Sequence, residues 1–188
     1  MCSEETEIGM TFARDSRYDA LSMALHWLSA ALVLIALALI EMKGVFGKGG
    51  GRDLVKLLHY QAGALVVMVT VFRLGWCAVR HAPKAPAAPG GVEEYVGRMV
   101  HWGLYAALLA VPVAGVVALL AAGKPTILLG IDLPVWIDGG KAVAKRYKHY
   151  HESVANGMIA LLCLHVGAAL WHRYVRRDAV MQRMLPGG

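Results

Sequence analysis

Four long apolar segments alternate with shorter polar segments along the chain. They cover residues 20–42, 54–78, 92–122 and 150–174, and each contains a run near the ~20 residues that a helix needs to cross ~30 Å of hydrocarbon. Because the backbone finds no hydrogen-bonding partner in lipid, helices are the expected structure for all four segments. The pattern therefore predicts an all-α fold class, an integral membrane four-helix bundle.

The polar segments divide the chain into a tail (1–19), a four-helix domain (20–175) and a second tail (176–188). With four membrane crossings, both tails lie on one side. Lys and Arg number ten in the tails and the 73–98 connector, with Arg173 just before the second tail included, and nine in the loops 43–56 and 124–148. The positive-inside rule therefore hardly separates the two sides. The basic cluster RYVRRDAVMQR, directly after the last apolar segment, favours a cytoplasmic location for the tails.

The composition supports a membrane protein, with 57% hydrophobic and 17% charged residues. Cys2, Cys77 and Cys163 are odd in number and form neither a CxxC nor a CxxCH motif. We therefore expect no structural disulfide, iron–sulfur cluster or covalently attached heme. Cys77 and Cys163 are expected to be small buried hydrophobic residues.

Eight histidines lie in or beside the apolar segments, where an ionisable side chain is costly without a partner. His151 and His165 are 14 residues apart, which places them ~21 Å apart along a helix and on nearly the same face. His26 and His59 lie near the starts of two helices that run in opposite directions. We therefore expect His59 and His151 at one membrane level, the loop-side level, and His26 and His165 at the other, the tail-side level.

Two histidines from different helices at each level indicate a ligand that is held by two imidazoles. Zinc needs three or four protein ligands, and no Asp, Glu or Cys is placed to complete either pair; Glu152, next to His151, points ~100° away. A b-type heme needs only two axial ligands, and its apolar ring suits a membrane interior. The spacing predicts two hemes b, with axial pairs His26/His165 and His59/His151.

The other four histidines divide into two groups. His149 and His81 are expected at solvated surface positions. His101 and His172 lie near the tail-side level, where they are expected to be interfacial structural groups or proton carriers; shifted helix boundaries would make them alternative ligands. Arg73, late in the second segment, is expected at the same level, in contact with a heme propionate or a quinone.

Several motifs resemble the bacterial cytochrome b561 family over about residues 15–186. They are ALHWL, LLHYQAG, HWGLYAALLAVPVAG, and KHYHESVAN followed by LHVGAALWHRYVRRDAVMQRMLP. The most specific element is the HES sequence that opens the fourth segment, with LH 14 residues later. The resemblance implies a multi-pass protein of the bacterial inner membrane with two hemes b, and it places the ligands at the same four histidines. It is nearest to family members that oxidise superoxide at the periplasmic face and reduce ubiquinone.

Bis-histidine ligation leaves the iron no open position, so we expect outer-sphere one-electron transfer and an oxidoreductase activity. The segments 41–56 and 124–152, on the side expected to be periplasmic, carry a net charge of +4. Such a surface would steer superoxide, a small anion. Lys145, Arg146 and Lys148 are the candidate steering residues; the alternative is a loop that contacts solvent or lipid headgroups.

Two other functions stay open. The chain could be a cytochrome b subunit that passes electrons between quinone and a partner dehydrogenase or hydrogenase, with the apolar stretch ILLGIDLPVWI as the surface for that redox partner. It could also be a divalent-metal transporter, although no Asp or Glu lies centrally in any apolar segment. The connector 123–148 is expected on the membrane surface. We expect membrane lipid, and no nucleic acid, among the partners.

Overall fold

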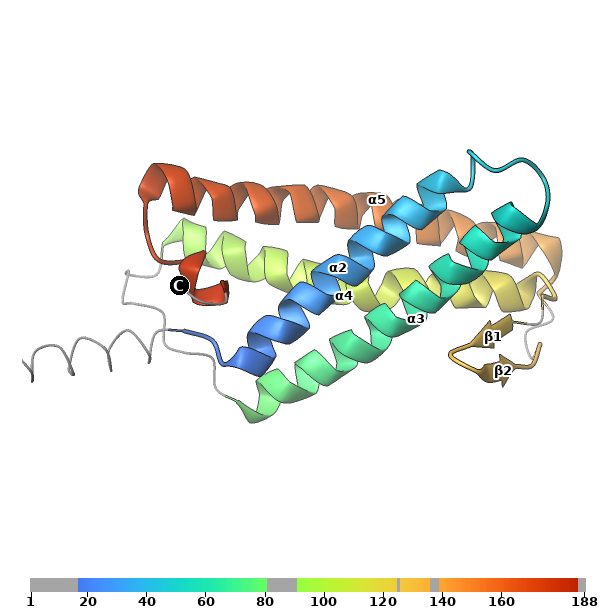
Figure 1. Ribbon diagram of the computed structural model, residues 1–188, viewed down its shortest axis with the longest axis horizontal. Helices are drawn as coiled ribbons and strands as arrows, with labels where there is room; N and C mark the ends of the chain where they lie inside the picture. The colour runs from blue at the N-terminus through green and yellow to red at the C-terminus, as the bar shows by residue number, and fades with distance from the viewer. Residues whose placement is uncertain (1–16, 81–90, 125, 136–138, 186–188) are drawn as a thin grey trace, which may run out of the picture.

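Four long helices form the protein (Figure 1). A computed structural model of the chain describes residues 17–80, 91–124, 126–135 and 139–185. The helices are α2 (Ala20–Met42), α3 (Gly50–Val79), α4 (Val92–Ala121) and α5 (Gly140–Trp171). All four are long and apolar enough to cross a membrane. The four predicted membrane-spanning helices are therefore present in the described part of the chain.

Two helices begin earlier than the apolar segments do. α5 begins at Gly140, ten residues before the expected start, and α3 begins at Gly50. The reason is that hydropathy marks the part of a helix that lipid covers, whereas the helix continues into water through residues such as Lys and Ala that favour it. Lys145, Arg146 and Lys148 consequently lie on α5 itself.

A short antiparallel hairpin, β1 (Thr126–Leu128) and β2 (Ile131–Leu133), interrupts the connector between α4 and α5. It lies at the end of the bundle away from the described chain ends (Figure 1). The all-α prediction did not include it, because two three-residue strands produce almost no alternating pattern. The fold is mostly helical, with this one hairpin in the described residues.

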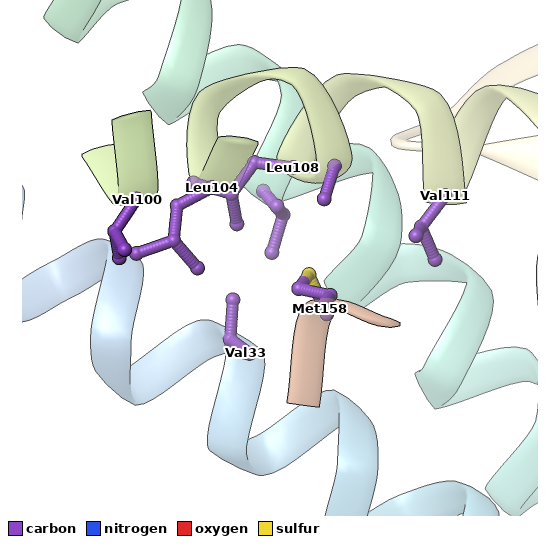
Figure 2. Close-up of a cluster of buried hydrophobic side chains, with 8 residues drawn as sticks. Val33, Val100, Leu104, Leu108, Val111 and Met158 are labelled. Carbon is purple, nitrogen blue, oxygen red and sulfur yellow. The ribbon is translucent and has the colours of Figure 1, made fainter. Parts of the chain in front are cut away.

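The helices pack as two pairs, α2 with α3 and α4 with α5, and α3 joins the pairs through α4. The core cluster contains side chains from all four helices, and Figure 2 shows Val33, Leu104, Leu108 and Met158 pointing toward one another. α5 packs closely on α4 but has hardly any close backbone contact with α2 or α3 within the described residues. α5 is therefore joined to α2 and α3 mainly through side chains of the core, such as Met158.

Much of the helix surface is outward-facing and apolar, as expected for lipid contact. Leu34 and Met68 are examples, with 65% and 57% of their surface exposed. Cys77 and Cys163 are also exposed, so the prediction that they are buried was wrong. A small apolar residue in a membrane bundle can face lipid as well as the core, and the sequence does not distinguish the two.

The described ends of the chain meet at one end of the bundle. The C-terminal segment contains a single π-helical turn, η1 (His172–Arg176), and a short 3-10 turn, η2 (Gln182–Met184). The Trp27 indole donates to the Met184 carbonyl at 2.8 Å, and the Arg17 guanidinium donates to the Leu185 carbonyl. The described ends of the chain, Arg17 and Leu185, therefore lie at the same end of the bundle; that both tails are cytoplasmic stays a prediction.

Candidate functional site

The loop-side pair consists of His59 on α3 and His151 on α5, whose ring centroids are 6.1 Å apart with an interplanar angle of 82°. His59 Nδ1 donates to the Ala36 carbonyl at 2.8 Å, and His151 Nδ1 donates to the Val111 carbonyl at 2.7 Å. A carbonyl only accepts, so Nδ1 carries the proton in both rings. The Nε2 atoms are left free, and this is the arrangement that orients a metal-ligating histidine.

Gly115 allows His151 to reach its carbonyl partner. A Cβ on this glycine would lie 2.9 Å from His151 Nδ1 and 3.2 Å from its Cε1, which is closer than van der Waals contact permits. The backbone of α4 at Val111 and Gly115 therefore forms part of the contact surface that positions His151. Gly115 and the two carbonyl acceptors were not among the predicted site residues, because a backbone group leaves no mark in a sequence.

The tail-side level holds three histidines. The rings of His26 on α2 and His165 on α5 have centroids 6.1 Å apart, and the His101 ring on α4 lies 5.2 Å from that of His165. The Nδ1 of His26 is buried and makes no hydrogen bond to any described residue. His172, also expected near this level, lies beyond the end of α5 and pairs with Asp178, Nδ1 to Oδ2, at 2.6 Å.

The distance between the ring centroids of each pair is close to that of two imidazoles that bind one metal from opposite sides. A metal–imidazole nitrogen distance of ~2.0 Å, with the ring centre ~1.1 Å behind the nitrogen, gives ~6.2 Å between the centroids of two opposed ligands. His26/His165 and His59/His151 both have 6.1 Å, whereas the His101–His165 distance of 5.2 Å is too short. Both predicted pairs fit a shared metal centre.

A protein-only metal site fits the same residues poorly. In the described part of the chain, no three His, Cys, Asp or Glu side chains are grouped as such a site requires. A porphyrin brings its own four nitrogens, so two imidazoles complete the coordination of its iron without a further protein ligand. The arrangement suits a heme at each level.

Arg73 on α3 lies at the tail-side level. Its guanidinium is 5.2 Å from the centre of the Tyr105 ring, and it is near enough to His26, His101 and His165 to act on all three electrostatically. A cation among neutral imidazoles suits a carboxylate or another anionic group. Its role as a contact for a propionate or quinone stays a prediction.

The three predicted steering residues are all exposed near the start of α5. Lys148 donates to Glu152, so its charge is partly offset. Lys145 and Arg146 form no hydrogen bond or ion pair with any residue that the structure describes. Lys43, which sequence reasoning missed, lies near enough to His59 and Glu152 to act on both electrostatically. Lys43 therefore lies near the loop-side pair, and the three cations of α5 lie three to six residues before His151.

The last two predicted histidines are peripheral. His149 is exposed near the start of α5, and His81 falls outside the described residues. At the tail end, partial burial opposes ionisation of Asp178. The hydrogen bonds from His172 and from the Val180 backbone N–H, together with the nearby His172 and Arg176 charges, outweigh burial and keep the pKa of Asp178 below its usual value. The Ser22 hydroxyl likewise lowers the pKa of Asp19, the N-cap of α2.

Comparison with known proteins assigns the family. A sequence model of the prokaryotic cytochrome b561 family matches residues 17–187, which include all four helices and both histidine pairs. The chain belongs to the prokaryotic cytochrome b561 family. Membership in the cytochrome b561 family implies a membrane electron-transfer protein with b-type heme, and the paired histidines are the candidate axial ligands.

Three similar relatives, each aligned over most of its length, carry different functional names. The chain is 29% identical to cytochrome b561 homolog 1 of Escherichia coli over 175 residues, 91% of this chain and 98% of the relative. It is 30% identical to the probable superoxide oxidase CybB of Yersinia pestis over 172 residues, 90% and 96% of the two chains. It is 28% identical to cytochrome b562 of Cereibacter sphaeroides over 180 residues, 89% and 94% of the two chains.

Proposed function

We propose that this cytochrome b561 protein binds two hemes b and carries single electrons across a bacterial inner membrane, from superoxide at the loop-side level to ubiquinone at the tail-side level. The observation that supports the proposal is that the same histidine-pair geometry occurs at both membrane levels. Two histidine pairs, each with a centroid distance of 6.1 Å, lie 14 residues apart along α5, so the centres would be ~21 Å apart.

The helices hold the ligands in fixed orientations. At the loop-side level, the Nδ1 hydrogen bonds of His59 and His151 fix each ring and raise the basicity of its Nε2. When bound, a bis-histidine heme supplies reversible one-electron chemistry without an open iron position. The apolar core of the bundle excludes water from the region between the two levels.

The cations at the loop-side end support superoxide as the donor. Lys145 and Arg146 are exposed and unpaired among the described residues, and Lys43 lies close to His59. Unpaired cations at the entrance raise the local concentration of a small anion and its encounter rate. The name of the Yersinia pestis relative, a probable superoxide oxidase, points in the same direction.

The polar groups at the tail-side end support quinone reduction. Two superoxide anions release two electrons and two molecules of oxygen, and one ubiquinone takes up these electrons with two protons to form ubiquinol. Arg73 can bind a polar head group or a heme propionate, and the His101 imidazole can take up and release a proton. With the tails in the cytoplasm, these protons would come from the cytoplasmic side.

The proposal is tested with purified protein in detergent, a superoxide-generating system and a short-chain ubiquinone. We expect superoxide to reduce the heme, ubiquinone to reoxidise it, and added superoxide dismutase to abolish both. His59→Ala is the matched control that lacks the entry centre. A heme that superoxide does not reduce would overturn the proposal. Stable co-purification with a dehydrogenase or hydrogenase would then select the alternative, a cytochrome b subunit for a redox partner.

A further inference from the structure

Gln61 is a polar residue on a face of α3 that is otherwise apolar and outward-facing. Leu54, Met68 and Phe72 lie within ~20° of it around the helix axis, and each is more than half exposed, at 55%, 57% and 55%. On a membrane-spanning helix this face contacts lipid. A primary amide is unfavourable there unless its donor and acceptor are both satisfied.

The β1–β2 hairpin satisfies both groups of the amide. Gln61 Nε2 donates to the Ile127 carbonyl at 2.7 Å, and the Leu129 backbone N–H donates to Gln61 Oε1 at 2.8 Å. β1 has only β2 as a neighbouring strand, so its other edge would leave backbone groups unpaired. The Gln61 side chain pairs with this edge as a third strand would. Such pairing stabilises the hairpin most where water is scarce, because in water the solvent would hydrogen-bond the strand edge and the amide instead.

The tip of the hairpin is apolar at a position where polar residues are the rule. Leu129 and Gly130 have φ values of 52° and 82°, as in the two-residue type I′ turn, which favours Asn, Asp or Gly because both residues need positive φ. Leu129 is 40% exposed, and Ile127 and Ile131 beside it are 53% and 66% exposed. A strained leucine between two exposed isoleucines suits an apolar surrounding rather than water.

The position of Gln61 along α3 sets the depth of the hairpin. Asp53 and Lys56 form an ion pair at the polar start of the helix, 2.9 Å apart, and Gln61 lies five residues beyond Lys56, or ~7 Å further along the axis. That is the boundary between headgroups and acyl chains, where interfacial segments bury their apolar faces. Asp132, opposite Ile127 in the hairpin, is exposed and would hold its strand at headgroup level.

We propose that the β1–β2 hairpin is a lipid anchor whose tip, Leu129 with Ile131, inserts among the acyl chains of the bilayer, and that Gln61 clamps it to α3. Its apolar surface is continuous with the lipid-facing side of that helix. In this arrangement lipid covers the hairpin part of the stretch, residues 127–133, that the sequence offered as a docking surface for a redox partner. The inference depends on the membrane-spanning helices and not on the proposed substrate.

Spin labelling in liposomes of phosphatidylcholine tests the insertion. A label at Ile131→Cys is compared with one at Lys48→Cys, in the exposed α2–α3 loop, and one at Met68→Cys, on the lipid-facing side of α3. The native cysteines are replaced by alanine, and an unchanged heme spectrum confirms that each variant is folded. Collision rates are measured with oxygen, which partitions into lipid, and with a water-soluble nickel complex.

We expect the Ile131 label to resemble the Met68 label, with a ratio of oxygen to nickel collisions several-fold above that at Lys48. A ratio equal to that at Lys48 would place the tip in water and overturn the proposal. Protection from both reagents would also overturn it, because a second copy of the chain or another protein would then cover the tip.

A second variant tests the clamp separately. Gln61→Leu keeps the face of α3 apolar but removes both hydrogen bonds to β1. We expect the Ile131 label to become more mobile and its collision ratio to fall toward that of the Lys48 label, while Met68→Leu, on the same face, leaves it unchanged. An unchanged label in Gln61→Leu would show that Gln61 does not hold the hairpin.

Discussion

Gly115→Ala perturbs one of the two histidine pairs without replacing either histidine. The new methyl group would lie 2.9 Å from His151 Nδ1, and ordinary contact needs at least ~3.4 Å. The imidazole must therefore move by about 0.5 Å, or α4 must yield by the same amount. The hydrogen bond to the Val111 carbonyl, 2.7 Å long, would stretch to the ~3.2 Å limit of such bonds and lose alignment.

The size of the effect follows from the role of that bond. A single hydrogen bond contributes ~1 kcal/mol to stability, but loss of the partner that orients a metal-ligating histidine lowers affinity 10- to 100-fold, or about 1.4–2.7 kcal/mol. We therefore expect Gly115→Ala to purify with less heme at the loop-side level and with full occupancy at the tail-side level. The heme content per chain would fall from about two toward one.

The assay is heme per chain by pyridine hemochromogen, together with a redox titration of the α-band that separates the two centres. The control is Gly157→Ala, because a Cβ at Gly157 meets nothing within 4 Å and this glycine is six residues from His151 and eight from His165. If Gly115→Ala retains both hemes with unchanged potentials, the proposal that Gly115 and the Val111 carbonyl position His151 is refuted. Equal loss of both hemes would indicate misfolding rather than a local effect.

Three further results are expected. His101→Ala keeps both hemes but shifts the potential of one, since 5.2 Å is too short for opposed ligation; loss of a heme in the pyridine hemochromogen assay would make His101 a ligand. Lys145→Gln combined with Arg146→Gln slows stopped-flow heme reduction by superoxide several-fold at low salt and little at high salt, whereas Lys148→Gln, whose charge is already paired, has a smaller effect at both. Asp178→Asn exposes the C-terminal segment to limited proteolysis. The wild type should show the same exposure as the pH falls through the lowered pKa of Asp178, because a carboxylate of lowered pKa stabilises the fold above its usual pKa and stops doing so on protonation.

Sequence periodicity was sufficient for the large features of the fold. Four apolar runs predicted four membrane-spanning helices, because only a helix satisfies its own backbone in lipid, and the family assignment followed from residues within those runs. The 14-residue spacing on α5 correctly placed His151 opposite His59 and His165 opposite His26, because helical geometry converts a sequence separation into a face and a height.

Other features depend on contacts between segments that a single sequence does not pair. The Val111 carbonyl and Gly115 support His151 from α4, 40 and 36 residues away in the chain. His101 was expected near the tail-side level, but its 5.2 Å approach to His165 was not. Glu152 was considered only as a poor metal ligand, and its actual partner is Lys148, one helical turn earlier on the outer face.

The central claim is that two histidine pairs each hold one heme. Heme per chain and the reduced-minus-oxidised spectrum, measured for the wild type, His59→Ala and His165→Ala, test it most directly. The account predicts two hemes in the wild type and one in each variant, with a different centre lost in each case. A single heme in the wild type, or two hemes retained in either variant, would contradict it.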